Sequence, residues 1–167
     1  MSTRTIVFAG GCFWGTEKLF SLVRGVSRTQ AVYANGPDDS PVTYQQVCAS
    51  SGHAEAVLVE YDPQTIPLTT LLDLFFDTID PFAVNQQGND RGIQYRSGIY
   101  YTDEADLPTI AAFVAEVEQS LRATIATEVE PLRNFCPAEE YHQDYLDKNP
   151  GGYCHLGPAA FAKARAL

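Results

Sequence analysis

The sequence has little positive charge and no long hydrophobic run. Its 11 lysines and arginines stand against 21 aspartates and glutamates, which gives a net charge of −10. Nucleic acids and anionic membranes both attract positive charge, so this balance argues against either as a partner. No apolar stretch approaches the length of a membrane span, and the apolar residues after Arg4 are too few for a signal peptide. We therefore expect a cytoplasmic protein.

The chain also lacks any Cys-x-x-Cys pair. Its cysteines are Cys12, Cys48, Cys136 and Cys154. In a reducing compartment they are not expected to form a structural disulfide framework. A zinc site could be assembled from Cys136, His142 and the pair Cys154-His155, but this spacing fits no compact zinc finger. No metal ion is therefore expected.

The length of the chain suits one folded unit. A chain of 167 residues, of which 45% are hydrophobic, can bury a substantial core. No internal repeat and no linker divides the sequence. We predict a single domain over residues 1–167, with a mobile, glycine-flanked tail from about residue 149 that carries Cys154.

Hydrophobic periodicity predicts helices between most strands. Helical patterns cover residues 16–24, 42–49, 68–79, 103–121, 138–148 and 159–166. Strands are predicted at residues 6–9, 26–34, 53–62, 93–101 and 123–129. The polar, amide-rich segment 80–92 is predicted to be a loop that suits the floor of a binding pocket. Helices packed against a mixed sheet indicate an α+β two-layer sandwich.

A glycine-rich stretch, Gly-Gly-Cys-Phe-Trp-Gly at 10–15, joins the first strand to the first helix. It places Cys12 at the helix N-terminus, where unpaired backbone N–H groups and the helix dipole favour a thiolate. The glycines let a substrate approach the backbone closely, and Phe13 and Trp14 offer apolar walls. A buried structural cysteine beside core aromatics is an alternative reading of the same stretch.

One carboxylate has an unusual place in the strand at 53–62. Alternation puts Glu55 on the same face as Val57, Val59 and Tyr61. Burial on an apolar face raises the pKa of a carboxyl group, which suits a proton donor at neutral pH. Alternatively, Glu55 lies at a frayed strand start and reaches water or an arginine.

These groups permit more than one thiol chemistry. A thiol that attacks, an acid that protonates a departing oxygen and a second thiol that resolves the product form a redox cycle. Tyr44 and Tyr95 could donate hydrogen bonds in such a site. A cysteine hydrolase would instead need a histidine base. Three histidines are available: His53, His142 and His155. Composition does not choose between these chemistries.

Four sequence blocks follow one another over nearly the whole chain. They are Gly-Cys-Phe-Trp-Gly at 11–15, Thr-Tyr at 43–44 with Gly-His-Ala-Glu-Ala-Val at 52–57, Gln-Gly-Asn-Asp at 87–90 with Gln-Tyr-Arg-Ser at 94–97, and Pro-Ala-Glu-Glu-Tyr-His-Gln at 137–143. The first and third blocks are highly specific. In this order the blocks resemble the A-type peptide methionine sulfoxide reductases.

The resemblance implies an oxidoreductase, peptide-methionine (S)-S-oxide reductase, that reduces the S epimer of free and protein-bound methionine sulfoxide. Cys12 would attack the sulfoxide sulfur and become a sulfenic acid. Glu55 would protonate the sulfoxide oxygen, with hydrogen bonds from Tyr44 and Tyr95. Cys154 would then form a disulfide with Cys12, which thioredoxin reduces.

The resemblance also implies the surroundings of this chemistry. Phe13 and Trp14 would hold the methyl group of the substrate, and Asp90 would help to position it. The implied fold is an α+β sandwich with a ferredoxin-like core, and no metal or organic cofactor is expected.

The chain departs from the family pattern at several points. It has Val-Tyr-Ala-Asn-Gly at 32–36 where relatives often have Gly-Tyr-Ala-Gly-Gly, and its segment 48–52 is one residue shorter. The shorter segment bears on the placement of Tyr44. Cys136 stands where relatives often have an aromatic residue, and the tail carries only Cys154. We expect structural roles for Cys48 and Cys136, and a role of Cys136 as a second thiol relay is the alternative.

Two other functions are kept as alternatives. A thiol peroxidase also forms a sulfenic acid, but it activates its cysteine with a nearby arginine and threonine instead of an acid such as Glu55. The second alternative is a non-catalytic module whose cysteines bind zinc.

Overall fold

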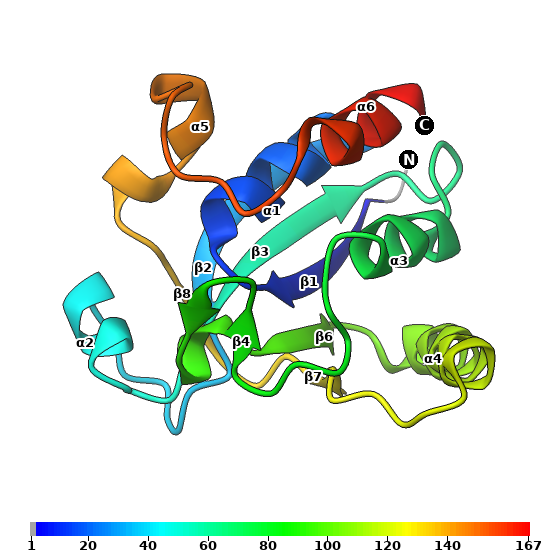
Figure 1. Ribbon diagram of the computed structural model, residues 1–167, viewed down its shortest axis with the longest axis horizontal. Helices are drawn as coiled ribbons and strands as arrows, with labels where there is room; N and C mark the ends of the chain where they lie inside the picture. Colours follow the sequence, from blue (N-terminus) through cyan, green and yellow to red (C-terminus); the bar gives the residue numbers. More distant parts are fainter. Residues whose placement is uncertain (1–2) are drawn as a thin grey trace.

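The computed structural model describes residues 3–167, which form a six-stranded sheet with helices packed against it (Figure 1). The strands of this sheet are β1 (Arg4–Gly10), β2 (Val26–Ala34), β3 (Ala54–Tyr61), β6 (Ser97–Tyr101), β7 (Glu128–Pro131) and β8 (Phe135–Pro137). Their order is β7-β6-β1-β3-β2-β8. Only β6 and β7 pair in parallel among these strands of the described chain, so the sheet is mixed.

The helices are α1 (Phe13–Ser21), α2 (Tyr44–Cys48), α3 (Leu68–Phe76), α4 (Leu107–Leu121), α5 (Tyr145–Lys148) and α6 (Pro158–Ala166). Side chains from α1, α3, α4 and α6 join the same apolar cluster on one face of the sheet. On β3, the residues Val57, Val59 and Tyr61 point into this cluster, while Ala56 and Leu58 face the opposite side. The predicted α+β two-layer sandwich is confirmed.

Three phenylalanines hold the centre of the core. The ring of Phe8 on β1 stacks on Phe20 of α1 at 4.8 Å and on Phe75 of α3 at 4.9 Å between ring centroids. All three side chains are fully buried. This stack fixes α1 and α3 on the central strand, and therefore fixes the turn that carries Cys12.

Both later strands were placed too early by the sequence prediction. The predicted strand at 93–101 begins only at Ser97, because Ile93–Tyr95 forms a short 3-10 turn after Gly92, whose φ is +142°. The predicted strand at 123–129 is instead β7, which starts at Glu128. The predicted loop 80–92 contains a small hairpin of β4 (Gln86–Gln87) and β5 (Asp90–Arg91). β8, at the edge of the sheet beside β2, was not predicted.

The predicted helix at 138–148 is wrong. This segment forms a 3-10 turn at Glu140–His142 and then the short α5, with Asp144 between them at a left-handed φ of 52°. Side chains of the segment bond to β2 instead of lying on a helix surface. Gln143 accepts from the Ala31 N–H at 2.8 Å, and Glu139 accepts from the Tyr33 hydroxyl at 2.7 Å. These contacts are long-range, so local periodicity does not show them.

The prediction for α4 is correct in position and incomplete in packing. Within α4 only Ile110 is fully buried, and Leu121 at its end is exposed. Phe113 of α4 stacks on Phe76 of α3 at 5.8 Å, so this helix packs beside α3 at the margin of the core. None of the helices formed by residues 3–167 has the length and apolar character that crossing a bilayer requires.

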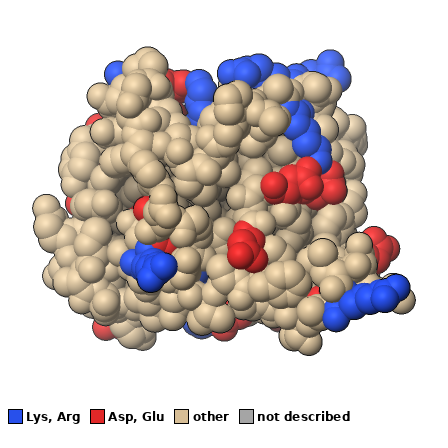
Figure 2. Space-filling view, viewed as in Figure 1, with Lys and Arg blue, Asp and Glu red and all other residues tan. Residues whose placement is uncertain are grey.

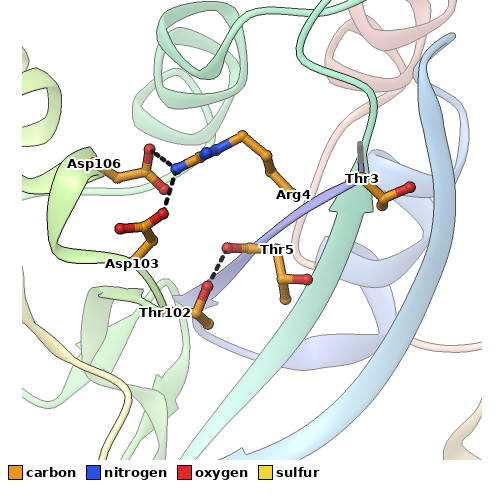
Figure 3. Close-up of a pocket in the computed structure, with 6 residues that line it drawn as sticks. All are labelled: Thr3, Arg4, Thr5, Thr102, Asp103 and Asp106. Atoms are coloured by element: carbon orange, nitrogen blue, oxygen red, sulfur yellow. Dashed lines mark hydrogen bonds and ion pairs between the residues drawn. The ribbon is translucent and has the colours of Figure 1, made fainter. Parts of the chain in front are cut away.

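The start of β1 is held by polar contacts to the segment before α4 (Figure 3). Arg4 forms ion pairs with Asp103 at 3.1 Å and Asp106 at 2.8 Å. The Thr102 hydroxyl donates to the Thr5 carbonyl at 2.8 Å. These contacts fasten the end of β1 opposite to Cys12.

We expect Phe8→Ala to lower the free energy of unfolding by about 3–5 kcal/mol, because it leaves a cavity between two buried rings. Urea denaturation of the reduced protein measures this change. Phe82→Ala is the control, since Phe82 is 45% exposed, and a change within about 0.5 kcal/mol is expected there. Equal effects of the two substitutions would contradict the central role of the stack.

Candidate active site

Cys12 lies in the turn between β1 and α1. Gly11 takes a left-handed φ of +88°, and Cys12 is the N-cap residue of α1. The side chain is only 7% exposed. Burial raises the pKa of the Cys12 thiol, the negative charge of Glu55 raises it further, and a backbone hydrogen bond from Trp14 lowers it less. The prediction of a thiolate is therefore wrong for the resting protein, because desolvation outweighs the helix N-terminus.

Glu55 reaches the same turn from β3. Its Oε1 accepts a hydrogen bond from the Phe13 N–H at 3.3 Å, while Oε2 is buried with no partner among the residues that the structure describes. The side chain is 1% exposed. Burial raises the pKa of Glu55 to about 8, and the charge of Asp90 adds to this effect. The predicted buried carboxyl with a raised pKa is confirmed, and at neutral pH it keeps a proton that it can donate.

Two tyrosine hydroxyls lie near this carboxyl group. Tyr44 is held at the start of α2, where its backbone N–H donates to Glu139 at 2.9 Å. Burial raises the pKa values of Tyr44 and Tyr95, and the charge of Glu55 raises both further. Both phenols therefore remain protonated hydrogen-bond donors. Despite the shortened segment after Cys48, the structure brings Tyr44 into the site.

The aromatic residues after Cys12 have different exposures. Phe13 is fully buried, with its ring packed against Tyr33 and His142, so it is not the open wall that the sequence suggested. Trp14 is only partly buried. Its ring stacks on Tyr145 at 3.7 Å between centroids, and its indole N–H donates to Nδ1 of His142 at 2.9 Å. Trp14 is therefore held in one orientation by the segment before and within α5.

His142 is a site residue whose position the sequence analysis missed. It is 1% exposed and packs on Phe13, Trp14 and Tyr44. Because Nδ1 accepts the indole hydrogen bond, its proton lies on Nε2, and burial lowers its pKa. The 3-10 turn, which replaces the predicted helix, points His142 inward. The run Pro-Ala-Glu-Glu-Tyr-His-Gln was the signal that could have found it.

Asp90 links the small hairpin to the tail. The Tyr153 hydroxyl donates to Asp90 Oδ2 at 3.0 Å. The hairpin itself is tied down by Gln87, whose side chain accepts from the Asp80 N–H at 2.8 Å and donates to the Asp80 carbonyl at 2.9 Å. The charge of Asp90 contributes to the raised pKa values of Cys12 and Glu55, so it lies beside both groups.

The tail brings Cys154 to the first turn of α1. In Figure 1 the segment after α5 passes the start of α1 before entering α6. The Cys154 sulfur lies 3.0 Å from the position that a Cβ on Gly15 would occupy, and it accepts from the Leu156 N–H at 3.4 Å. Gly15 therefore makes room for the tail, a role that the sequence analysis had given to the substrate.

The other two cysteines lie on α2 and β8, and Cys48 is close enough to Tyr44 and Tyr95 to raise the pKa of both. Cys48 is exposed at the end of α2, and Cys136 is half-buried on β8 with its sulfur 3.9 Å from the Val42 carbonyl oxygen. Within residues 3–167 all four cysteines are free. No three His, Cys, Asp or Glu side chains in this part of the chain gather as metal ligands would.

The molecular surface adds little to the choice of site. The face shown in Figure 2 is mostly free of charged side chains, and its lysines and arginines do not form one broad patch. A separate pocket, lined by Thr3, Arg4, Thr5, Thr102, Asp103 and Asp106, opens at the start of β1 (Figure 3). It contains no thiol, and its arginine is already paired with two carboxylates. The chemistry of the chain therefore centres on Cys12.

Two thiols brought to one helix start, beside an acid that keeps its proton, can carry out thiol redox chemistry. On an α+β sandwich this defines a thiol-dependent oxidoreductase. A family model described as "Peptide methionine sulfoxide reductase" matches residues 4–166. The chain belongs to this family, which displaces the thiol peroxidase alternative.

Known proteins agree with this assignment. A peptide methionine sulfoxide reductase MsrA of Lachnoclostridium phytofermentans is 53% identical over 97% of this chain and 98% of that relative. The structure of Mxr1 from Saccharomyces cerevisiae in reduced form superposes with a TM-score of 0.85 at 42% identity, covering 91% of this chain and 88% of that one. Mxr1 in complex with Trx2 gives a TM-score of 0.61 at 30% identity, covering 86% and 84%.

The raised pKa of Glu55 predicts how stability changes with pH. Its pKa moves from 4.5 to about 8 on folding, so the unfolded chain ionises first and stability falls as pH rises through this window. We expect Glu55→Gln to remove this loss. Relative to the wild type, the free energy of unfolding of the variant should rise by up to a few kcal/mol between pH 5 and pH 8. Urea denaturation at the two pH values measures it.

Glu139→Gln is the matched control. Burial raises the pKa of Glu139, but hydrogen bonds from the Tyr44 N–H and the Tyr33 hydroxyl lower it below its usual value. The stability that the ionised Glu139 contributes is lost only as pH falls through the acid range. The difference in free energy of unfolding between Glu139→Gln and the wild type is therefore expected to stay constant from pH 5 to pH 8. A flat profile for Glu55→Gln would contradict a protonated Glu55.

Proposed function

We propose that the chain reduces the S epimer of methionine sulfoxide, free or within proteins, with Cys12 as the nucleophile. The observation that carries this proposal is the buried Glu55 carboxyl, with a pKa of about 8, at the turn that holds Cys12. Family membership supplies the substrate class, as the relatives are named for it. The residue roles rest on the geometry of the site.

In the first step the Cys12 sulfur attacks the sulfoxide sulfur as the thiol proton leaves. Glu55 gives its proton to the sulfoxide oxygen, which then transfers to Cys12 as the substrate S–O bond breaks. Methionine leaves, Cys12 becomes a sulfenic acid, and the proton lost by the thiol restores Glu55. Protonation of Glu55 beforehand removes the charge that raises the pKa of Cys12, so the two groups are suited to react in this order.

The neighbouring residues receive supporting roles. The hydroxyls of Tyr44 and Tyr95 hydrogen-bond the sulfoxide oxygen, since their raised pKa values keep them as donors. The exposed part of Trp14, with Phe13 behind it, binds the substrate methyl group. Asp90 positions the substrate and is itself oriented by Tyr153.

Cys154 then resolves the sulfenic acid as a Cys12–Cys154 disulfide, which thioredoxin reduces. Mxr1, a structural neighbour, was solved in complex with Trx2, which supports thioredoxin as the reductant. This cycle treats residues 1–167 as one catalytic domain whose tail, from about residue 149, moves when the disulfide forms. Four free cysteines suit a reducing compartment, so we also infer that the enzyme works in the cytoplasm.

Turnover of the separated S and R epimers of a methionine sulfoxide peptide tests the proposal. We expect the wild type to reduce only the S epimer, with dithiothreitol or with thioredoxin, and Cys12→Ser to be inactive with both. Cys154→Ser is expected to work with dithiothreitol and to fail with thioredoxin. Cys48→Ser and Cys136→Ser are the controls and should cycle normally. A wild type that reduces neither epimer would overturn the assignment.

The pH profile tests Glu55 separately. The protonated acid is lost as pH rises through about 8, so the rate of methionine formation in a first turnover is expected to fall above that pH. Glu55→Gln should lower this rate by about 10²–10⁴-fold and remove the basic limb. Glu60→Gln, on the same strand but paired with Arg28 at the surface, is the control. An unchanged profile in Glu55→Gln would exclude it as the proton donor.

A further inference from the structure

His155, next to Cys154 in the tail, has an unusual environment that the mechanism above does not use. Its Nε2 lies 3.0 Å from the carbonyl oxygen of Gly10. A carbonyl oxygen can only accept, so Nε2 carries the proton and the opposite nitrogen, Nδ1, has a free lone pair. Nδ1 is buried and has no hydrogen-bond partner among the residues that the structure describes.

This unpartnered nitrogen lies close to the Cys154 thiol. A Cβ built on Gly15 would lie 3.0 Å from the Cys154 sulfur and 3.4 Å from His155 Nδ1. Both atoms therefore lie against the same small residue, although no hydrogen bond joins them in this state. The glycine at position 15 is what allows the thiol and the imidazole to share this space.

The resolving reaction needs a proton acceptor at this place. The attacking species in disulfide formation is the thiolate. Burial raises the pKa of Cys154 more than its hydrogen bond from the Leu156 N–H lowers it, so at neutral pH the group is a thiol. Nδ1 of His155 lies against the same glycine as the Cys154 sulfur and has a free lone pair that can accept this proton.

We propose that His155 is the proton acceptor for Cys154 in the resolving step, which rests on the proposed sulfenic acid at Cys12. The Cys154 sulfur attacks the Cys12 sulfur while His155 Nδ1 takes the thiol proton. The S–S bond forms, the S–O bond breaks, and the departing hydroxide takes the proton from His155 and leaves as water. Cys154 is oxidised, the Cys12 sulfur is reduced to the disulfide level, and no further reactant is needed.

The surroundings of His155 suit a transient positive charge. Its Nε2 carries a proton in the neutral ring and in the imidazolium, so both forms can donate to the Gly10 carbonyl. Burial lowers the pKa of His155, while that hydrogen bond and the charge of Asp90 raise it. The neutral ring is therefore the resting form, and Asp90 favours the imidazolium once it forms.

The test separates the two halves of one turnover. Reduced enzyme without any reductant is mixed with excess peptide S-sulfoxide, and methionine release and loss of free thiols are followed in parallel. His155→Gln can keep a donor to Gly10 while replacing the basic ring nitrogen by an amide oxygen that does not take up a proton near neutral pH, and His155→Ala removes both groups. We expect wild-type methionine release in His155→Gln, with disulfide formation slowed by about 10²-fold, the lower end of the usual range for loss of a general base.

Chemical rescue of His155→Ala distinguishes a proton acceptor from a residue that only holds the tail in place. Added imidazole is expected to restore part of its rate of disulfide formation, with a rescue that follows the fraction of neutral imidazole as pH is changed. Disulfide formation at the wild-type rate in His155→Gln would overturn the proposal and leave His155 only a tether. Absence of methionine release in the wild type would instead overturn the proposed function.

Discussion

The hydrogen bond from the Phe13 N–H to the Glu55 carboxyl joins the start of α1 to β3, and the rest of the site is arranged around it. It holds an acid, buried and protonated, beside the turn that carries Cys12. Burial costs folding stability because the unfolded chain would ionise this group freely. The stacked core of Phe8, Phe20 and Phe75 secures the two elements on which that bond depends.

The positions of most strands of the sheet, and those of Cys12 and Glu55, follow from the local sequence pattern. The alternation in β3 placed Glu55 among apolar residues, and the glycine-rich stretch placed Cys12 at the start of a helix, because both signals lie within a few residues. The ionisation state of Cys12 did not follow. It depends on how deeply the turn is buried and on the charge of Glu55, which is 43 positions away in the sequence and next to it only in the fold.

The part of the site that residues 139–155 form depends on long-range contacts, which hydrophobic periodicity does not predict. Gln143 and Glu139 accept hydrogen bonds from Ala31 and Tyr33 of β2. These contacts replace the predicted helix by turns and direct His142 toward Trp14. Tyr153 and His155 reach back to Asp90 and Gly10 in the same way. Here local propensity predicted the wrong backbone, because the contacts that shape this segment are long-range.

Trp14 is the only tryptophan in the chain. Its ring stacks on Tyr145 and its N–H bonds to His142, both of which belong to the segment that leads into the tail. All indole fluorescence of the protein therefore originates two residues from Cys12, in contact with the segment that leads to Cys154. The chain thus contains its own optical probe of this part of the structure, which needs no added label.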